Sequence, residues 1–258
     1  MRLCRLFGVA VTTLCMCVNF SACRNGDDAG SGDFTGERKL VKMIFNYADV
    51  GEIYLFNYDN QGRAIEAKWA YVDDDNNAWN QLFIWKDNTL QVMDDGSHRC
   101  TYTIKNGLVR SEYVPPYDNY SGALNVYYTY NTSNRLIREI SERNGQSYSY
   151  YTTWNADKLI SQEGAGDYDV TYTYEDLTCI KGYCPLYLLD QIYMAHPEIF
   201  GMKSTQLPVS CAKKHRGGQS ECDYTETYQY EFDAEGYISK IIVKDDKGYT
   251  YPIILTWK

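Results

Sequence analysis

Apolar and polar residues alternate along most of the chain between residues 40 and 257. Three stretches share one phrase: YLFNYDNQGRAI (54–65), VYYTYNTSNRLI (126–137) and YQYEFDAEGYI (228–238). In each stretch aromatic residues take every second position, a short polar turn follows, and an aliphatic run returns. A period of two places the aromatic residues on one face of a strand. The repeated phrase therefore predicts β-hairpins.

The turn within each phrase carries the residue types of a type I turn. Asp or Asn stands first, where its side chain can accept a hydrogen bond from the backbone two residues later. Gly or Asn stands fourth, where a positive φ is tolerated. We interpret the phrase as a folding device rather than a ligand site, because turn chemistry and cross-strand aromatic pairs account for it. The first and fourth turn residues are Asp59 and Gly62, Asn131 and Asn134, and Asp233 and Gly236.

The alternation predicts many strands joined by short connections. Most of the connections have two to six residues, which favours an antiparallel up-and-down meander. A sheet with that many strands must curl or close. The predicted fold class is all-β, a meander of repeated hairpins that forms a strongly curved sheet or an open barrel. We expect strands at 40–47, 52–58, 63–71, 79–86, 89–93, 100–105, 108–113, 123–130, 135–142, 147–154, 158–162, 168–175, 208–214, 223–232, 237–245 and 249–257.

One insertion breaks the alternation and predicts a short helix within residues 185–200. In PLYLLDQIYMAH (185–196), Pro185 suits a first helical turn and Pro197 ends the helix. The apolar residues follow a helical period. The insertion either plugs or caps the barrel, or covers an apolar sheet edge; we favour the edge. The helix-period residues are Leu186, Leu189, Ile192 and Tyr193.

The first 22 residues have the pattern of an export signal. Arg2 and Arg5 precede a run of roughly 13 apolar residues, which is too short to span a bilayer. Phe20-Ser21-Ala22-Cys23 resembles the bacterial lipobox, which implies a lipid on Cys23. The alternatives are a plain secretory signal cut near Ala22, or a buried N-terminal helix.

Residues 23–36 follow as a tether rich in Gly, Asp and Ser, and residues 37–258 are predicted to form a single β-meander domain. The early acidic residues Asp27 and Asp28 resemble a surface-export signal of Bacteroidota lipoproteins, or belong to a solvated linker. Loss of the signal removes two of the 25 basic residues and none of the 34 acidic ones, which leaves a net charge of −11. Such a chain is a poor partner for nucleic acid or anionic lipid.

The segment FNYDNQGR (56–63) resembles the tyrosine–aspartate (YD) repeats of Rhs-type and teneurin shells. The whole pattern is similar to a family of Bacteroidota lipoproteins of unknown function, which has a lipobox, hairpin repeats and a porin-like β-sheet. The resemblance covers most of residues 40–258. It implies a fold and an outer-membrane location, on the periplasmic face or at the cell surface, and it implies no activity.

A membrane pore requires strands with an uninterrupted apolar outer face. Here the non-aromatic face of the strands carries charged and polar residues, and both faces of 237–245 include them. We therefore expect a water-soluble sheet that meets the membrane only through its N-terminal lipid. The polar residues on the non-aromatic face include Arg138, Glu142, Gln229 and Glu231.

Four cysteines surround the helical insertion, and an oxidising compartment favours disulfides between them. Four cysteines allow three connectivities. We prefer Cys211–Cys222 across a hairpin, followed by Cys179–Cys184. A zinc site made by Cys211, His215 and Cys222 is the alternative, and no metal is our prediction because the spacing fits no standard zinc pattern.

The sequence contains no nucleophile, metalloprotease or phosphate-loop motif, so we expect no catalytic residues, no enzyme activity and no cofactor. The chain has 26 Tyr and five Trp. Aromatic rings can stack on sugars while neighbouring polar groups bind hydroxyls. The stacking candidates are Trp69, Trp79, Trp85 and Trp154, although we favour cross-strand packing in a large sheet as the explanation for them.

These observations favour a lipid-anchored, non-catalytic envelope protein that presents a curved aromatic β-surface to a glycan or to another envelope protein. A periplasmic structural or assembly scaffold with no small ligand is the alternative. A glycan hydrolase with an unrecognised carboxylate pair is the third hypothesis, since such pairs need no proximity in sequence.

Overall fold

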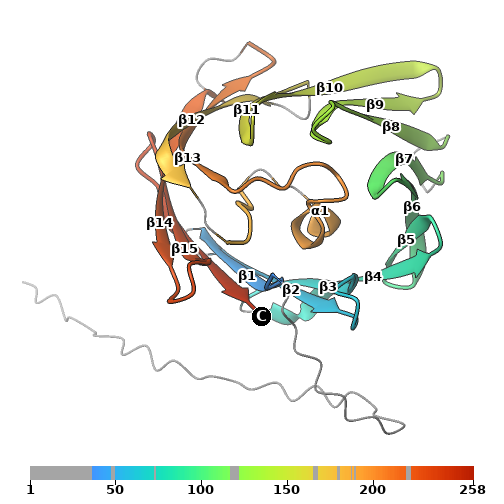
Figure 1. The fold of residues 1–258 in the computed structure, drawn as a ribbon, viewed down its shortest axis with the longest axis horizontal. Coiled ribbons are helices and arrows are strands. Elements are labelled where there is room, and N and C mark those ends of the chain that lie inside the picture. The colour runs from blue at the N-terminus through green and yellow to red at the C-terminus, as the bar shows by residue number, and fades with distance from the viewer. Residues whose placement is uncertain are drawn as a thin grey trace, which may run out of the picture. The chain divides into compact units, whose positions relative to one another are not determined.

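Sixteen antiparallel strands form a closed barrel in the described part of the chain (Figure 1). The structure, a computed structural model, describes residues 37–258 except 48–49, 73, 117–121, 165–167, 179–180, 187, 189 and 219–221. The predicted signal, the tether and Cys23 lie outside the described residues. The strands are β1 (Leu40–Tyr47), β2 (Val50–Tyr58), β3 (Ala64–Tyr71), β4 (Asp74–Lys86), β5 (Thr89–Asp94), β6 (Ser97–Lys105), β7 (Leu108–Val114), β8 (Leu124–Tyr130), β9 (Leu136–Arg143), β10 (Gln146–Asn155), β11 (Lys158–Glu163), β12 (Tyr168–Thr178), β13 (Gln206–His215), β14 (Tyr224–Phe232), β15 (Ile238–Asp245) and β16 (Thr250–Trp257).

Each strand pairs with the next along the chain, and β16 pairs with β1 to close the barrel. The closing seam sets Leu40 opposite Trp257 and Phe45 opposite Ile253. The predicted all-β meander is therefore confirmed, and the sheet is closed rather than open. Closure removes the two sheet edges that a meander of this length would otherwise expose.

The barrel has two ends of different character. We call one the plug end, because residues 181–205 leave β12 there, enter the interior and return to β13 (Figure 1). The beginning of β1 and the end of β16 also meet at this end, where the amide of Lys39 donates to the carbonyl of Lys258 at 2.6 Å. The opposite end is the far end. Since strands alternate in direction, the turns after β2, β8 and β14 all lie at the plug end.

These three turns repeat one hydrogen-bonding pattern. The first side chain accepts two backbone N–H groups, and the fourth residue has a positive φ. The pattern ties each turn to the strand that follows it. Asp59 Oδ1 accepts from Gln61 and Arg63, Asn131 Oδ1 from Ser133 and Arg135, and Asp233 Oδ1 from Glu235 and Tyr237; φ is 73° at Gly62, 60° at Asn134 and 89° at Gly236.

The aromatic residue near the plug end of seven even-numbered strands has a shared role. Its O–H or N–H donates to a backbone carbonyl at the start of the preceding strand. Several of these sites lie beside register shifts, where a bulge removes the usual ladder partner. We call the seven residues the aromatic girdle: Tyr58 to Leu40 (2.8 Å), Trp85 to Ala64 (2.7 Å), Tyr130 to Val109 (2.6 Å), Trp154 to Leu136 (2.6 Å), Tyr174 to Leu159 (2.8 Å), Tyr230 to Pro208 (2.5 Å) and Trp257 to Ile238 (2.7 Å).

Residues 181–205, the plug, fill much of the barrel interior. Their helix, α1 (Gln191–Ala195), is shorter than the predicted 185–196, because Asp190 caps it by accepting from the amide of Ile192 at 3.2 Å. Pro185 is therefore outside the helix. The structure also decides between the two predicted roles: the insertion plugs the barrel and does not cover an edge, since a closed barrel has none.

The plug is held by hydrogen bonds to the barrel wall and by aromatic packing. The amide of Ala64 donates to His196 Nε2 at 2.7 Å, and the amide of Val109 donates to the carbonyl of Ile199 at 2.8 Å. Phe200 is fully buried and stacks on Tyr193 with ring centroids 3.8 Å apart. The barrel core is thus built between wall and plug.

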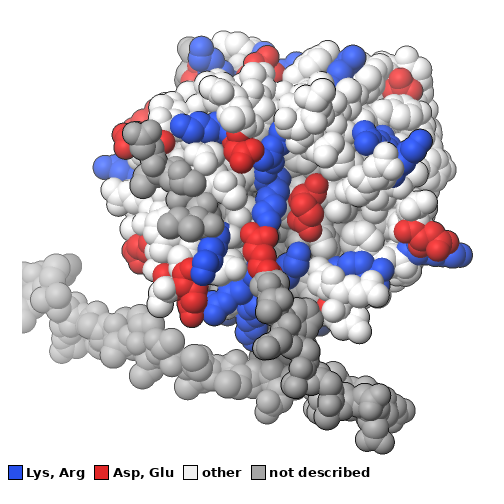
Figure 2. Space-filling view, viewed as in Figure 1, with Lys and Arg blue, Asp and Glu red and all other residues white. Residues whose placement is uncertain are grey.

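The outer face of the barrel is mixed in polarity. Tyr230 and Ile241 pair across β14 and β15 and face inward, so the next pair, Glu231 and Lys240, faces outward and forms an exposed ion pair at 2.9 Å. Figure 2, which is viewed along the barrel axis, shows that basic and acidic side chains are also interspersed over one end of the barrel. In the described part of the chain, no helix has the length and apolar character of a membrane span.

Candidate functional site

Two open cavities lie inside the barrel, lined by residues toward the far end of the strands. The first, the tryptophan pocket, has a volume of about 390 Å³. Strands β3 and β4 place Trp69 opposite Trp79 on the inward face, with ring centroids 6.4 Å apart and planes at 86°. Trp79 is 57% exposed although it faces the interior. The pocket is lined by Trp69, Trp79, Gln81, Arg99, Asp190 and Gln191.

An ion pair joins the wall of this pocket to the plug. Arg99 donates to the carboxylate of Asp190 at 2.8 Å and lies 3.6 Å from that of Asp94. Burial alone would lower the pKa of Arg99, but the two carboxylates outweigh burial and raise it. Burial raises the pKa of the Asp94 carboxyl against the opposing effect of Arg99. Because Asp190 also caps α1, this ion pair positions the helix start against β6.

Gln81 is the buried polar side chain of the tryptophan pocket. It is only 5% exposed, and its Oε1 accepts no hydrogen bond from any described residue. A buried acceptor without a donor costs about 1–3 kcal/mol. Such a group in a native protein calls for an explanation. A ligand hydroxyl placed between the indole rings and Gln81 would supply the donor.

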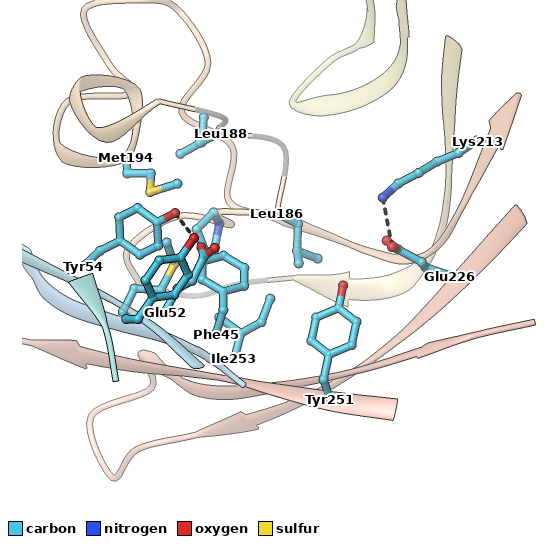
Figure 3. A pocket seen from close by; sticks show the side chains of 13 residues that line it. Phe45, Glu52, Tyr54, Leu186, Leu188, Met194, Lys213, Glu226, Tyr251 and Ile253 are labelled. Atoms are coloured by element: carbon cyan, nitrogen blue, oxygen red, sulfur yellow. Dashed lines mark hydrogen bonds and ion pairs between the residues drawn. The ribbon is translucent and has the colours of Figure 1, made fainter. Parts of the chain in front are cut away.

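The second cavity, which we call the methionine cavity, has a volume of about 540 Å³ and lies between strands β16, β1 and β2 and the plug (Figure 3). Apolar side chains form most of its wall, and tyrosines and three charged groups complete it. It is lined by Met43, Phe45, Glu52, Tyr54, Tyr71, Pro185, Leu186, Leu188, Met194, Lys213, Glu226, Tyr251 and Ile253.

The charged groups of the methionine cavity differ in how they are paired. Lys213 donates to Glu226 at 2.9 Å, and Glu226 also accepts from Tyr228 at 2.8 Å. Burial would lower the pKa of Lys213, but Glu226 outweighs burial and raises it. Glu52 accepts a hydrogen bond from the neutral hydroxyl of Tyr54 at 2.9 Å and forms no ion pair with a described residue.

The four predicted stacking tryptophans fall into two groups. Trp69 and Trp79 come together in the tryptophan pocket. Trp85 and Trp154 belong to the aromatic girdle at the plug end, and their indole N–H groups are already bonded. Arg135 lies over the ring of Trp154, 5.1 Å from its centroid. Ligand stacking remains a prediction, and the first pair lines an open cavity.

The predicted Cys211–Cys222 disulfide is not formed in the structure. Cys211 is a buried free thiol on the inward face of β13, and it accepts from the hydroxyl of Tyr228 at 2.9 Å. Burial is the main cause that raises the pKa of its thiol to about 11. The second predicted pairing, Cys179–Cys184, includes Cys179, which lies outside the described residues. Among described residues no cluster of His, Cys, Asp or Glu is arranged to hold a metal ion.

Two carboxylates on the inward face of the barrel wall, Glu112 on β7 and Glu139 on β9, were not predicted from the sequence. Glu112 accepts from the hydroxyl of Tyr128 at 2.9 Å, and Glu139 lies opposite Tyr128 on β9. Burial raises the pKa of Glu112, and burial followed by repulsion from Glu112 raises the pKa of Glu139 to about 7. Both residues could have been found from the sequence, because each is a carboxylate at a position that strand alternation places on the inward face.

Strand alternation could also have revealed Glu52 and Gln81, since each lies two residues from an inward-facing aromatic residue of its own strand. Arg99 and Asp190 could not be found this way. Arg99 lies beside a register shift of β6, and Asp190 reaches the site only because the plug enters the barrel.

Comparison with solved structures identifies porin-like proteins as similar in fold. One, from Bacteroides uniformis, has a TM-score of 0.65 and 15% sequence identity, and the match covers 86% of this chain and 98% of that one. Another, from Bacteroides vulgatus, has a TM-score of 0.55 and 14% identity over 86% of this chain and 99% of that one. No family model and no curated protein matches the sequence. At this identity the likeness concerns the fold alone.

Proposed function

We propose that this protein is a non-catalytic, lipid-anchored barrel of the bacterial envelope that binds a saccharide in the tryptophan pocket. The observation that carries the proposal is the pair of inward tryptophans beside Gln81, whose buried Oε1 accepts no hydrogen bond from the described residues. Indole faces pack on the apolar faces of sugar rings. The surrounding amides, carboxylate and guanidinium provide partners for hydroxyl groups.

Two features argue that the barrel is not an open pore in a membrane. The plug occupies the interior, with Phe200 fully buried between wall and helix. The outer face carries charged pairs such as Glu231–Lys240 where a lipid-facing strand needs apolar residues. The proposed contact with the membrane is therefore the lipid on Cys23, followed by the tether at 23–36, and the chain enters the barrel at its plug end.

Envelope location rests on two supports. The sequence Phe20-Ser21-Ala22-Cys23 resembles a lipobox, and the proteins similar in fold are described as porin-like and come from Bacteroides. Replacing Cys23 with Ala tests the anchor, because the protein should then leave the membrane fraction. Unchanged membrane association of this variant would contradict the proposed lipid.

The binding test uses residues 24–258 and a broad panel of neutral and acidic glycans, followed by calorimetry on any hit. We expect saturable binding that Trp79→Ala abolishes. Tyr127→Ala is the matched control, because Tyr127 is 44% exposed on the outer face and lies outside the pocket. If folded protein binds no glycan, the saccharide proposal fails and the scaffold alternative takes its place.

A further inference from the structure

We propose that the methionine cavity is a second ligand site, separate from the saccharide site, and that it takes a small apolar molecule bearing an amine. The cavity volume of about 540 Å³ falls within the range of small-molecule pockets, roughly 300–1,000 Å³. Protein interiors are otherwise packed with few voids larger than a water molecule.

The wall of the cavity suits an apolar ligand of variable shape. Phe45 and Ile253 face each other across the seam between β1 and β16, and Leu186, Leu188 and Met194 oppose them from the plug (Figure 3). Methionine side chains are flexible and polarisable, so they adapt to irregular ligands. Transfer of an apolar molecule from water into contact with this wall is the main source of the expected affinity.

The charges select the head group of that ligand. Lys213 is already neutralised by Glu226, which itself holds a second donor from Tyr228. Glu52 receives only the neutral hydroxyl of Tyr54, so the lining carries one carboxylate that no described cation pairs. An ammonium group would pair with Glu52, whereas a carboxylate on the ligand would be repelled by Glu52 and Glu226.

The methionine cavity lies beside the tryptophan pocket, and aromatic rings separate the two, but different residues line each cavity. Tyr54 lies opposite Trp69 on the neighbouring strand, and the Trp69 and Tyr71 rings meet edge to face at 4.9 Å. The two lining sets have no residue in common. The amine site therefore does not depend on saccharide binding, and each can fail alone.

The experiment measures binding of octylamine, octanol and octanoate to the protein without its signal, by calorimetry and thermal shift. We expect octylamine to bind most tightly and octanoate most weakly. Glu52→Gln should reduce octylamine affinity about tenfold and leave octanol unchanged, since the neutral amide removes the charge that pairs with the ammonium group. Glu231→Gln, on the outer face, is the matched control.

Leu186→Trp provides an independent test, because the larger ring fills the cavity and should remove binding of both octylamine and octanol. The near-UV circular dichroism and the urea unfolding midpoint of Leu186→Trp show whether the rest of the interior is intact. Equal affinity for octylamine and octanoate, or full octylamine affinity in Glu52→Gln, would overturn the amine assignment. If none of the three compounds binds to folded protein, the methionine cavity is not a ligand site.

Discussion

The two ends of the barrel use tryptophan for different purposes. Trp85 and Trp154 at the plug end donate their indole N–H groups to strand carbonyls at 2.7 and 2.6 Å. Trp69 and Trp79 face the same interior nearer the far end, and Trp79 is 57% exposed beside an open pocket. All four occupy inward positions of the same sheet. Bonding and exposure, rather than residue type, therefore separate folding aromatics from ligand candidates.

Buried polar groups divide in the same way. At the plug end the aromatic girdle supplies donors to carbonyls beside strand bulges. Deeper in the barrel, Gln81 Oε1 lacks a donor among the described residues, and Glu139 is a buried carboxyl whose neighbour Glu112 repels it. Native proteins depart from full satisfaction chiefly at functional or strained sites. The plug end is thus optimised for stability, and the rest of the interior is not.

The largest expected effect is on the plug itself. Phe200→Ala should lower the free energy of unfolding by about 3–5 kcal/mol, because it removes a fully buried ring packed on Tyr193 and Tyr102. Urea denaturation measures the change, and Tyr127→Ala on the outer face serves as the control, with an expected loss below about 1 kcal/mol. Equal losses in both variants would mean that the plug does not organise the core.

The next effect concerns Glu139 and depends on pH. Burial raises its folded-state pKa from 4.5 to about 7, so the folded protein prefers the protonated form. Its contribution to stability is fully present below pH 4.5 and is lost as the pH rises through about 7. Glu139→Gln should therefore stabilise the protein at pH 8, by up to about 3 kcal/mol, and have little effect at pH 4.

Unfolding of wild type and Glu139→Gln in urea, followed between pH 4 and pH 8, tests this expectation. Glu142→Gln is the control, since Glu142 is in the same strand but its side chain is exposed to solvent. A pH-independent difference between wild type and Glu139→Gln would show that Glu139 does not titrate in this window.

Local sequence was sufficient to predict most of the wall. Alternation predicted the meander, and turn chemistry predicted which residues start each hairpin turn. Two local predictions were wrong: β4 begins at Asp74 rather than at residue 79, and α1 spans five residues rather than twelve. β4 begins early because Asp74 pairs with Tyr71 across the tight turn from β3. α1 begins late because Asp190 caps it and Leu188, just before the cap, packs in the core.

Barrel closure and the site depended on contacts that local patterns do not contain. Leu40 and Trp257 pair across almost the whole described chain, and nothing in either segment specifies the other. Strand alternation indicates Trp69 and Trp79 as candidates but does not separate them from Trp85 and Trp154, because all four follow the same alternation. The two pairs differ because of the plug, which fills the interior at the plug end and contributes Asp190 to the tryptophan pocket.

A matched pair of substitutions tests the division between the tryptophans directly. Trp85→Phe keeps an aromatic ring, although a smaller one, and removes the N–H that donates to the carbonyl of Ala64, so it should cost about 1–2 kcal/mol of unfolding free energy. The indole N–H of Trp79 donates to no described residue. Trp79→Phe should therefore change the free energy of unfolding by less than about 0.5 kcal/mol. Chemical denaturation of both variants gives the comparison.

The reverse ranking, with Trp79→Phe the more damaging, would place the structural tryptophans at the far end and contradict the division. Glycan affinity should rank the two variants in the opposite order, since ring electronics and the indole edge matter only where a ligand contacts them. Reduced affinity in Trp85→Phe alone would move the candidate site to the plug end.

The smallest expected effect is the most specific to the proposed site. Gln81→Leu replaces a buried amide whose Oε1 has no donor among the described residues with an apolar side chain of similar size. The substitution removes this acceptor but also the hydrogen bond that the Gln81 side chain gives to Asp94. Stability should therefore change by less than about 1 kcal/mol, whereas saccharide affinity should be lost. Gln91→Leu is the control, since Gln91 is exposed on β5 and its replacement should change neither quantity. Lost affinity with nearly unchanged stability is expected where a polar group is retained for a ligand. Unchanged saccharide affinity in Gln81→Leu would instead identify Gln81 as an ordinary core residue, and the tryptophan pocket would then lack the group that distinguishes it from aromatic packing.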